Sequence, residues 1–296
     1  MIAPLARIWS GMSPMARGVF LVSTGSLTLV IMGSITKLLG DRLPSFELLF
    51  FRSFVGFFFV APLFWRDPTE PFRTKRFGMH FVRGAIGSAG NMCFFWTLTH
   101  MLLADAMALQ FSRPLFMIPL AVLFLREVVS ANRMIVSTIG FAGILLYARP
   151  FTAGFDPNVV VGAMGAMFGG LVIVCIKRLS TTESTATIMF YYAFWNAILV
   201  AIPTWSVWVT PQGAEWPLLV LIGILGIGGQ ALVTSGLRLG DSTALTPLDY
   251  SRVLYSAIIG FLFFGELPGP WSLAGMGLIL AASLYLVLTE RRRGPA

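Results

Sequence analysis

The sequence predicts an all-α membrane protein in which ten transmembrane helices form two inverted five-helix repeats. Two observations carry this prediction. The 296-residue chain is 56% hydrophobic and only 11% charged, with a mean hydropathy of +0.81, which lies outside the range of ordinary soluble domains. In addition, a set of residues in the first half recurs in the second half at an offset of 139 or 140 residues.

Glycines, charged residues and aromatic residues at matching positions define the repeat. Internal repeats of this kind build secondary transporters, with the substrate site near the interface of the two copies. At an offset of 139, the matched residues are Gly84, Gly87, Gly90, Asn91, Ser112, Arg113 and Glu127 in the first copy and Gly223, Gly226, Gly229, Gln230, Ser251, Arg252 and Glu266 in the second. At an offset of 140, Lys37 matches Lys177 and Phe50 matches Phe190.

Apolar stretches long enough to cross about 30 Å of hydrocarbon follow one another along the chain. We expect each to be a helix, because the hydrocarbon offers backbone N–H and C=O groups no other partner. The ten expected spans are 18–39, 46–65, 78–100, 104–125, 132–148, 159–176, 187–208, 217–237, 243–264 and 270–289. The first repeat then covers residues 1–148 and the second covers 159–290.

Lysines and arginines predict the orientation of the protein in a bacterial cytoplasmic (inner) membrane. Each repeat has an odd number of spans, so the second copy enters the membrane from the opposite side. With the N-terminus inside, 14 basic residues fall on inner segments and 3 on outer loops. The positive-inside rule therefore predicts that both termini are cytoplasmic. Topology also explains the basic loop at 66–76, so we expect no nucleic-acid partner.

Other residues exclude several classes of protein. Cys93 and Cys175 lie within spans and define neither a disulfide framework nor a metal site. The two histidines and two cysteines are scattered, so nothing marks an enzyme, and we expect no cofactor. The first span could be mistaken for a signal peptide, but its repeat mate at 159–176 lies in mid-chain, so we expect it to be retained.

Small residues and prolines indicate how the spans meet. Gly162, Ala166 and Gly170 share one face of a helix, as do the repeated glycines of the third and eighth spans. Small side chains let helix backbones approach closely, so we interpret them as packing positions, with gating or substrate contact as the alternative. Pro114 and Pro119 should kink the fourth span.

Arg113 and Arg252 lie about nine residues into their spans, which is near mid-depth at about 1.5 Å per residue. An arginine at the centre of a span costs about 2.5 to 3.5 kcal/mol, so each needs a partner or a function. One interpretation is a receptor for a carboxylate, which a guanidinium binds in a bidentate fork. The alternative is that each ties helices together, Arg252 through Asp249, while Glu47 could pair with Arg52 or Arg113.

Asn91 and Gln230 form a second repeated polar pair near mid-depth. Each either lines a central cavity or forms an interhelical hydrogen bond. The neighbours that we expect around this cavity are Gln110, Ser112, Asp249, Tyr250, Ser251, Phe95 and Trp96. The aromatic members would suit a cargo with an apolar or aromatic side chain.

Further motifs follow the repeat. The third span opens with Arg83-Gly84, the fourth contains Ala104-Asp105-Ala106 and Leu109-Gln110-Phe111-Ser112-Arg113-Pro114, and the two copies close on Glu127 and Gly265-Glu266. Over nearly its whole length the chain resembles the EamA-type drug/metabolite transporter superfamily, and within it the bacterial aromatic amino-acid exporters (YddG-type). The second copy departs from the pattern, because Ile222 stands opposite Arg83 and Asp241 is out of register with Asp105.

The resemblance implies an inner-membrane exporter of small amphipathic metabolites, including aromatic and neutral amino acids, that works by alternating access. We expect a monomer or weak dimer in the lipid bilayer. A drug or nucleotide-sugar transporter on the same fold is the alternative, and a channel-like assembly would show flux without saturation. Proton-driven carriers usually bury an acid or a histidine at mid-depth. Only Asp249 qualifies, so we expect weak or absent proton coupling.

Overall fold

The computed structural model of the chain describes residues 13–60, 74–125, 131–148, 155–239, 245 and 248–291. Glu127, Gly240-Asp241, Arg149 and the basic residues at 66–73 lie outside this part. The described residues form helices and no β-strand. The helices are α2 (Pro14–Gly40), α3 (Ser45–Val60), α4 (Phe77–His100), α5 (Leu103–Gln110), α6 (Arg113–Leu120), α7 (Ala131–Ala148), α8 (Pro157–Leu179), α9 (Thr185–Ser206), α10 (Glu215–Leu239), α12 (Ser251–Phe264) and α13 (Pro270–Arg291).

Each predicted span corresponds to a helix or to a pair of consecutive helices. Five described helices are long and apolar enough to cross a membrane, namely Pro14–Gly40, Leu103–Phe124, Pro157–Leu179, Thr187–Ser206 and Glu215–Leu237. Three shorter apolar helices are Met134–Ala148, Ser251–Phe264 and Pro270–Tyr285. The predicted all-α membrane fold with a duplicated five-helix repeat is therefore confirmed.

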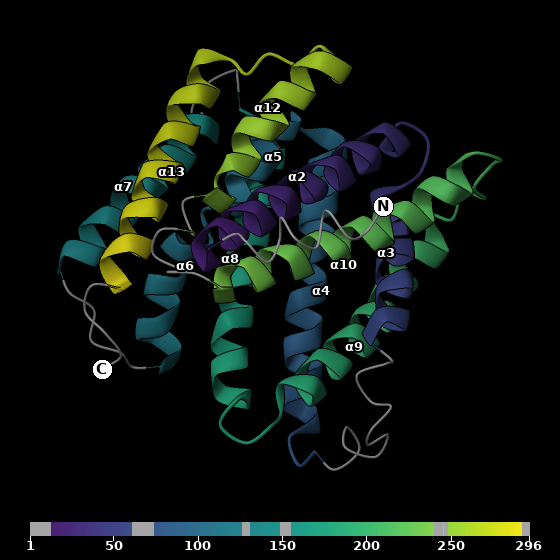
Figure 1. Ribbon diagram of the computed structural model, residues 1–296, viewed down its shortest axis with the longest axis horizontal. Coiled ribbons are helices and arrows are strands. Elements are labelled where there is room, and N and C mark those ends of the chain that lie inside the picture. Colours follow the sequence, from purple (N-terminus) through teal and green to yellow (C-terminus); the bar gives the residue numbers. More distant parts are fainter. Residues whose placement is uncertain are drawn as a thin grey trace.

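The helices pair across the two repeats rather than within one. α2 packs along α10 and α4 packs along α8, and these contacts are repeat-related, since α2 matches α8 and α4 matches α10. α7 packs on α13 at one flank of the molecule, and α3 packs on α9 at the other (Figure 1). α5 contacts α12 between the flanks. A pseudo-two-fold axis in the membrane plane produces this pattern.

Glycines bring the paired helices into backbone contact. A Cβ added to Gly25 of α2 would lie 2.8 Å from the carbonyl oxygen of Gly229 in α10. A Cβ added to Gly165 of α8 would lie 3.4 Å from the carbonyl oxygen of Gly90 in α4. These two crossings match in the repeat, as do their glycines. The contacts are those that the packing interpretation of the glycines predicts.

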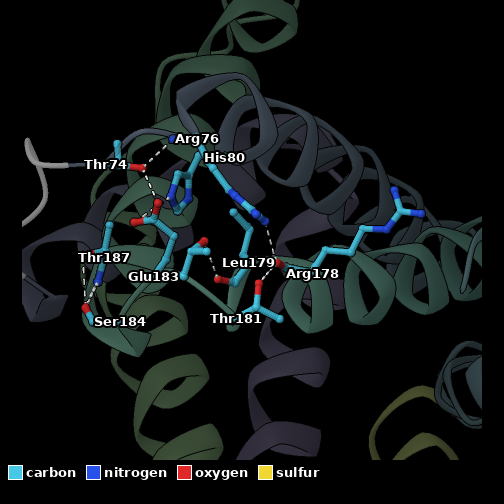
Figure 2. A network of polar contacts seen from close by, with 10 residues as sticks. Thr74, Arg76, His80, Arg178, Leu179, Thr181, Glu183, Ser184 and Thr187 are labelled. Carbon is cyan, nitrogen blue, oxygen red and sulfur yellow. Dashed lines mark hydrogen bonds and ion pairs between the residues drawn. The ribbon is translucent and has the colours of Figure 1, made fainter.

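Polar contacts tie the two repeats together at both ends of the bundle. We name the end with Glu266 the outer end and the end with Glu183 the inner end, after the predicted topology. At the outer end, Lys37 Nζ lies 2.6 Å from Glu266 Oε1. At the inner end, the Thr74 hydroxyl donates to Glu183 at 2.8 Å, and His80 Nε2 lies 3.8 Å from the same carboxylate (Figure 2).

Candidate functional site

Two repeat-related helices are broken at the centre of the molecule. α5 ends at Gln110 and α6 begins at Arg113, so the fourth predicted span is interrupted at residues 111–112. In the ninth predicted span, helical residues 248–249 precede a turn at Tyr250, and α12 begins at Ser251. These positions match in the repeat. Broken helices of this kind form the substrate sites of many secondary transporters.

The local sequence explains the break in the first copy. The Ser112 hydroxyl donates to the carbonyl oxygen of Leu109 at 2.6 Å, a local bond that competes with helix continuation. Pro114 lacks the N–H that an uninterrupted helix needs, but it is tolerated in the first turn of α6. Pro119 lies inside α6, just before a π-helical segment at Ala121–Leu125. The distortion predicted from the two prolines is thus present.

The two breaks meet at the pseudo-two-fold axis. Phe111 and Tyr250, which occupy matching positions, stack with ring centroids 4.4 Å apart and an interplanar angle of 22°. Residues that match in two repeats touch each other only where they lie close to the axis that relates the repeats. The stacked rings therefore mark this axis, and their neighbours in sequence lie at the repeat interface.

Arg113 and Arg252 each bind the side chain three residues earlier. Arg113 Nη2 donates to Oε1 of Gln110, and Arg252 Nη2 lies 2.5 Å from Oδ1 of Asp249. Asp249 also accepts a hydrogen bond at 2.8 Å from the hydroxyl of Ser26 in α2. Both copies thus have an arginine that contacts the side chain three residues earlier, but only the second copy has an acidic residue at that earlier position. Arg252 has a counter-charge on its own span, whereas the partner of Arg113 is a neutral amide.

Arg113 borders solvent-accessible space although it lies in the middle of its predicted span. Its side chain is exposed, and its charge interacts with those of Arg252 and Asp249. Its aliphatic part lies against Gly169 of α8, where an added Cβ would be 2.8 Å from Arg113 Cδ. A larger residue at position 169 would displace this arginine. The two arginines therefore concentrate positive charge at the repeat interface.

Asn91 forms an interhelical hydrogen bond. Its Nδ2 donates to the hydroxyl of Tyr192 in α9 at 2.6 Å. One turn away, Asn196 accepts from Ser88 of α4 at 3.0 Å and donates to Ser53 of α3 at 2.6 Å. α3, α4 and α9 are thus joined by side-chain amides and hydroxyls. Sequence reasoning missed Tyr192, because its match in the first copy is Arg52, a residue of different chemistry.

Gln230 differs from Asn91, its match in the repeat. Its side chain is exposed, although it lies one turn beyond Gly226, which packs against Arg52 of α3 and Met32 of α2. On a helix, residues four apart share a face. Gln230 therefore lies near the face of α10 that packs on α2 and α3, with its own side chain exposed.

Trp96 lies apart from this central group. Its Nε1 donates to Asn158 at 2.9 Å, where α8 begins at the outer end. Glu47 also lies toward the outer end, where its Oε2 accepts from the backbone N–H of Val209 at 3.0 Å. Among the described residues, Glu47 therefore bonds neither to Arg113 nor to Arg52, the two partners that the helix-tying alternative allowed.

Three further residues expected around the cavity are buried. Ser112 is fully buried and Phe95 is 1% exposed, and the hydroxyl oxygen of Ser251 is buried as well. Ser112 contributes to the first helix break through its bond to Leu109, whereas the Ser251 hydroxyl has no hydrogen-bond partner among the described residues. Phe95 packs beside the guanidinium of Arg52. The structure thus brings together Gln110, Arg113, Asp249, Tyr250 and Arg252, with Asn91 and Gln230 on the neighbouring helices α4 and α10.

Comparison with known proteins agrees with this architecture. A model of the EamA-like transporter family matches residues 16–149 and 157–288, one match for each repeat. A solved crystal structure superimposes with a TM-score of 0.59 at 20% identity, over 95% of this chain and 99% of that one. The likeness shows that the fold is shared.

Curated relatives are transporters with different cargo. The chain is 31% identical over 258 residues to an S-adenosylmethionine uptake transporter of Rickettsia felis, with 87% of each chain covered. It is 32% identical to a pseudopaline exporter of Pseudomonas aeruginosa, over 93% of this chain and 97% of the relative. It is 29% identical to a riboflavin transporter of Brucella anthropi, over 85% and 92% of the two chains.

Proposed function

The chain belongs to the EamA-like transporter family, and we propose that it exports small amphipathic metabolites with an α-amino-acid group, including aromatic and other neutral amino acids. Membership makes it a membrane transporter of small molecules. The cargo class rests on one observation: among the described residues, Arg113 has only a neutral hydrogen-bond partner, and it stands beside the ion pair of Arg252 and Asp249.

This arrangement suits both charges of an α-amino acid. A guanidinium binds a carboxylate through two parallel hydrogen bonds, and Arg113 can offer them because no described carboxylate is paired with it. Asp249 supplies negative charge for the ammonium group. Phe111 and Tyr250 offer ring surface to an apolar side chain. A few convergent polar groups among apolar walls fix the orientation of a small ligand.

The relatives support this cargo class in part. S-Adenosylmethionine, named for the Rickettsia felis relative, carries an α-amino-acid group. Relatives work in both directions, since one is named for uptake and another for export. Export is therefore the part of the proposal that needs its own test.

Reconstitution into proteoliposomes tests the cargo and the direction. We expect saturable flux of phenylalanine and threonine that each unlabelled amino acid inhibits. To find the direction, flux is measured separately in vesicles that expose the inner end and in vesicles that expose the outer end. If the protein is an exporter, the KM for the amino acid is lower at the inner end than at the outer end. Absence of flux for every amino acid of a full panel would refute the cargo class.

The proposed orientation has both termini in the cytoplasm. Single cysteines at positions Asp41 and Asp156, in a background without Cys93 and Cys175, should react with a membrane-impermeant maleimide added outside intact cells. If the cysteines react only after the membrane is permeabilised, the assignment of the inner and outer ends is the wrong way round.

A further inference from the structure

Arg83 of α4 is buried without a counter-charge among the described residues. The residue is 7% exposed, and its Nε and Nη1 atoms donate to no described group. Its guanidinium carbon lies 3.9 Å from the centroid of the Tyr192 ring. A buried charge without a partner costs several kcal/mol. An ionisable residue within a span is therefore a candidate for function.

Arg83 lies between the inner end and the central group. It is seven residues from Arg76, the N-cap of α4, and eight from Asn91, distances of about 10 Å and 12 Å along the helix. Tyr192 connects these levels, because its ring contacts Arg83 and its hydroxyl accepts from Asn91.

A basic pocket of about 450 Å³ lies at the inner end, where α4 begins. Arg76, Met79, Arg178 and Thr181 line it. Arg76 Nη1 donates to the carbonyl oxygen of Arg178 at 2.9 Å, and the guanidinium of Arg178 points away from the carboxylate of Glu183 (Figure 2). Within the described part of the chain, backbone carbonyl oxygens hold these two arginines and no carboxylate neutralises them.

Arginines thus follow one another from the inner end to the repeat interface, along the contact of α4 with α8 and α9. Arg76 and Arg178 lie at the pocket, Arg83 lies about two turns deeper, and Arg113 lies at the helix break. Such an order lets an anion pass from one positive group to the next without leaving a favourable field. The second copy does not repeat it, because the match of Arg83 is Ile222, which is fully buried.

We propose that Arg83 forms an anion-binding site of its own, which takes a carboxylate group of the cargo between the basic pocket and Arg113. This proposal rests on the proposed function for the identity of the cargo, but the site itself does not. Because Ile222 cannot bind an anion, the site exists in the inner half only. Loading from the inner end is then favoured over loading from the outer end.

Binding of succinate tests the site without transport. Succinate carries carboxylates and no amino group, and a ligand of the folded state raises the melting temperature of a purified protein in a saturable way. We expect such a rise in the wild type, a persisting rise in Arg113→Gln, a smaller rise in Arg83→Gln, and the smallest in the double variant, in which only the basic pocket remains. Sodium chloride at equal ionic strength is the control.

Two outcomes would overturn the proposal. If Arg113→Gln alone abolishes the succinate response, all binding occurs at the repeat interface. If the wild type shows no response beyond sodium chloride, Arg83 binds no carboxylate. Succinate binding at Arg83 without flux of any amino acid would instead keep the site and refute the proposed cargo, so the two failures are distinguishable.

Stability without ligand separates binding from helix anchoring. Arg83→Gln removes an uncompensated buried charge, so the variant should melt at the wild-type temperature or above it. A loss of several degrees would mean that Arg83 holds helices together. Arg52→Gln is the matched control, since Arg52 is an arginine of α3 in the outer half that lies beside the Phe95 ring. Its succinate response should equal that of the wild type, and an equal loss in both variants would refute a specific site.

Discussion

The two helix breaks share one backbone design and differ in charge. In the first copy, Arg113 binds the neutral side chain of Gln110. In the second copy, Arg252 is paired with Asp249 at 2.5 Å. A cation that already has a counter-ion gains less from a second one, so Arg113 is the better receptor for an incoming carboxylate. Duplication thus preserved the framework of the site, while the two copies diverged in the groups that can bind cargo.

The largest effect is expected when the first copy is made to resemble the second. Gln110→Glu gives Arg113 a counter-charge of its own, in competition with a cargo carboxylate. Hydrogen bonds to charged groups contribute about 1.5 to 3 kcal/mol, so transport should fall by about 10-fold to 100-fold in kcat/KM. Amino-acid flux in proteoliposomes measures this effect, and the melting temperature should not fall. Wild-type flux would mean that Arg113 does not bind the carboxylate.

Exchange of each arginine for lysine compares the two positions directly. Arg113→Lys keeps the charge but loses the planar fork, so flux should fall about tenfold. Arg252→Lys should change flux much less, because lysine can still pair with Asp249. Both variants should elute as single monodisperse species. Equal losses would show that the two copies contribute alike, and no loss in either would leave both arginines as charge anchors.

Removal of the counter-ion in the second copy should affect stability. Asp249→Asn leaves Arg252 without its charge partner and weakens the bond from Ser26. The side chains of the ion pair are 18% and 21% exposed, so water screens part of the effect, and we expect a loss of about 1 to 3 kcal/mol. Thermal unfolding in detergent measures it. The double variant with Arg252→Gln should recover stability, and failure to recover would show that Asp249 acts through Ser26.

The repeated amides should respond differently from each other. Asn91→Leu removes a hydrogen bond to Tyr192, worth about 0.6 kcal/mol on average in a membrane bundle, so it should lower the melting temperature slightly. Gln230→Leu removes no described hydrogen bond, so it should leave stability unchanged and reduce flux if the side chain contacts cargo. Flux and melting temperature measured on both variants test this contrast. Wild-type flux in Gln230→Leu would remove this residue from the site.

The smallest effect is expected from a pH gradient. Proton-driven carriers usually bury an acid or a histidine at mid-depth. Asp249 is the acid that the sequence predicts there, and it is already engaged by Arg252 and by the hydroxyl of Ser26. An imposed gradient should therefore change flux less than about twofold, a change of under about 0.4 kcal/mol in the barrier. Strict dependence on the gradient would identify Asp249 or another acid as a proton carrier.

The sequence predicted the features that the repeat duplicates. Hydropathy placed the spans, and the repeat register placed Arg113 and Arg252 on either side of one axis. The first helix break was signalled by Pro114. The second was not predicted, because Val253 stands at the position that matches Pro114, and the proline of the second copy, Pro247, comes three residues before Tyr250 in the sequence and has no match in the first copy.

Features that depend on helix rotation escaped prediction. Trp96 and Asn91 lie on the same helix, but whether a side chain points to the centre or to a neighbouring helix depends on packing, which a single sequence does not encode. Arg83 was recognised only as part of a motif. Its burial against Tyr192 requires α9 to lie beside α4. The residue of the first copy that matches Tyr192 is Arg52, so the repeat does not predict an aromatic ring next to Arg83.

The stack of Phe111 on Tyr250 has a consequence for the history of the fold. If the two repeats descend from one five-helix chain that assembled as an antiparallel dimer, the residue on the axis contacted its own copy, as in any isologous interface. A change at that position then altered both partners at once. Fusion of two genes would remove this constraint, and the two positions now differ by one hydroxyl, present on Tyr250 and absent from Phe111.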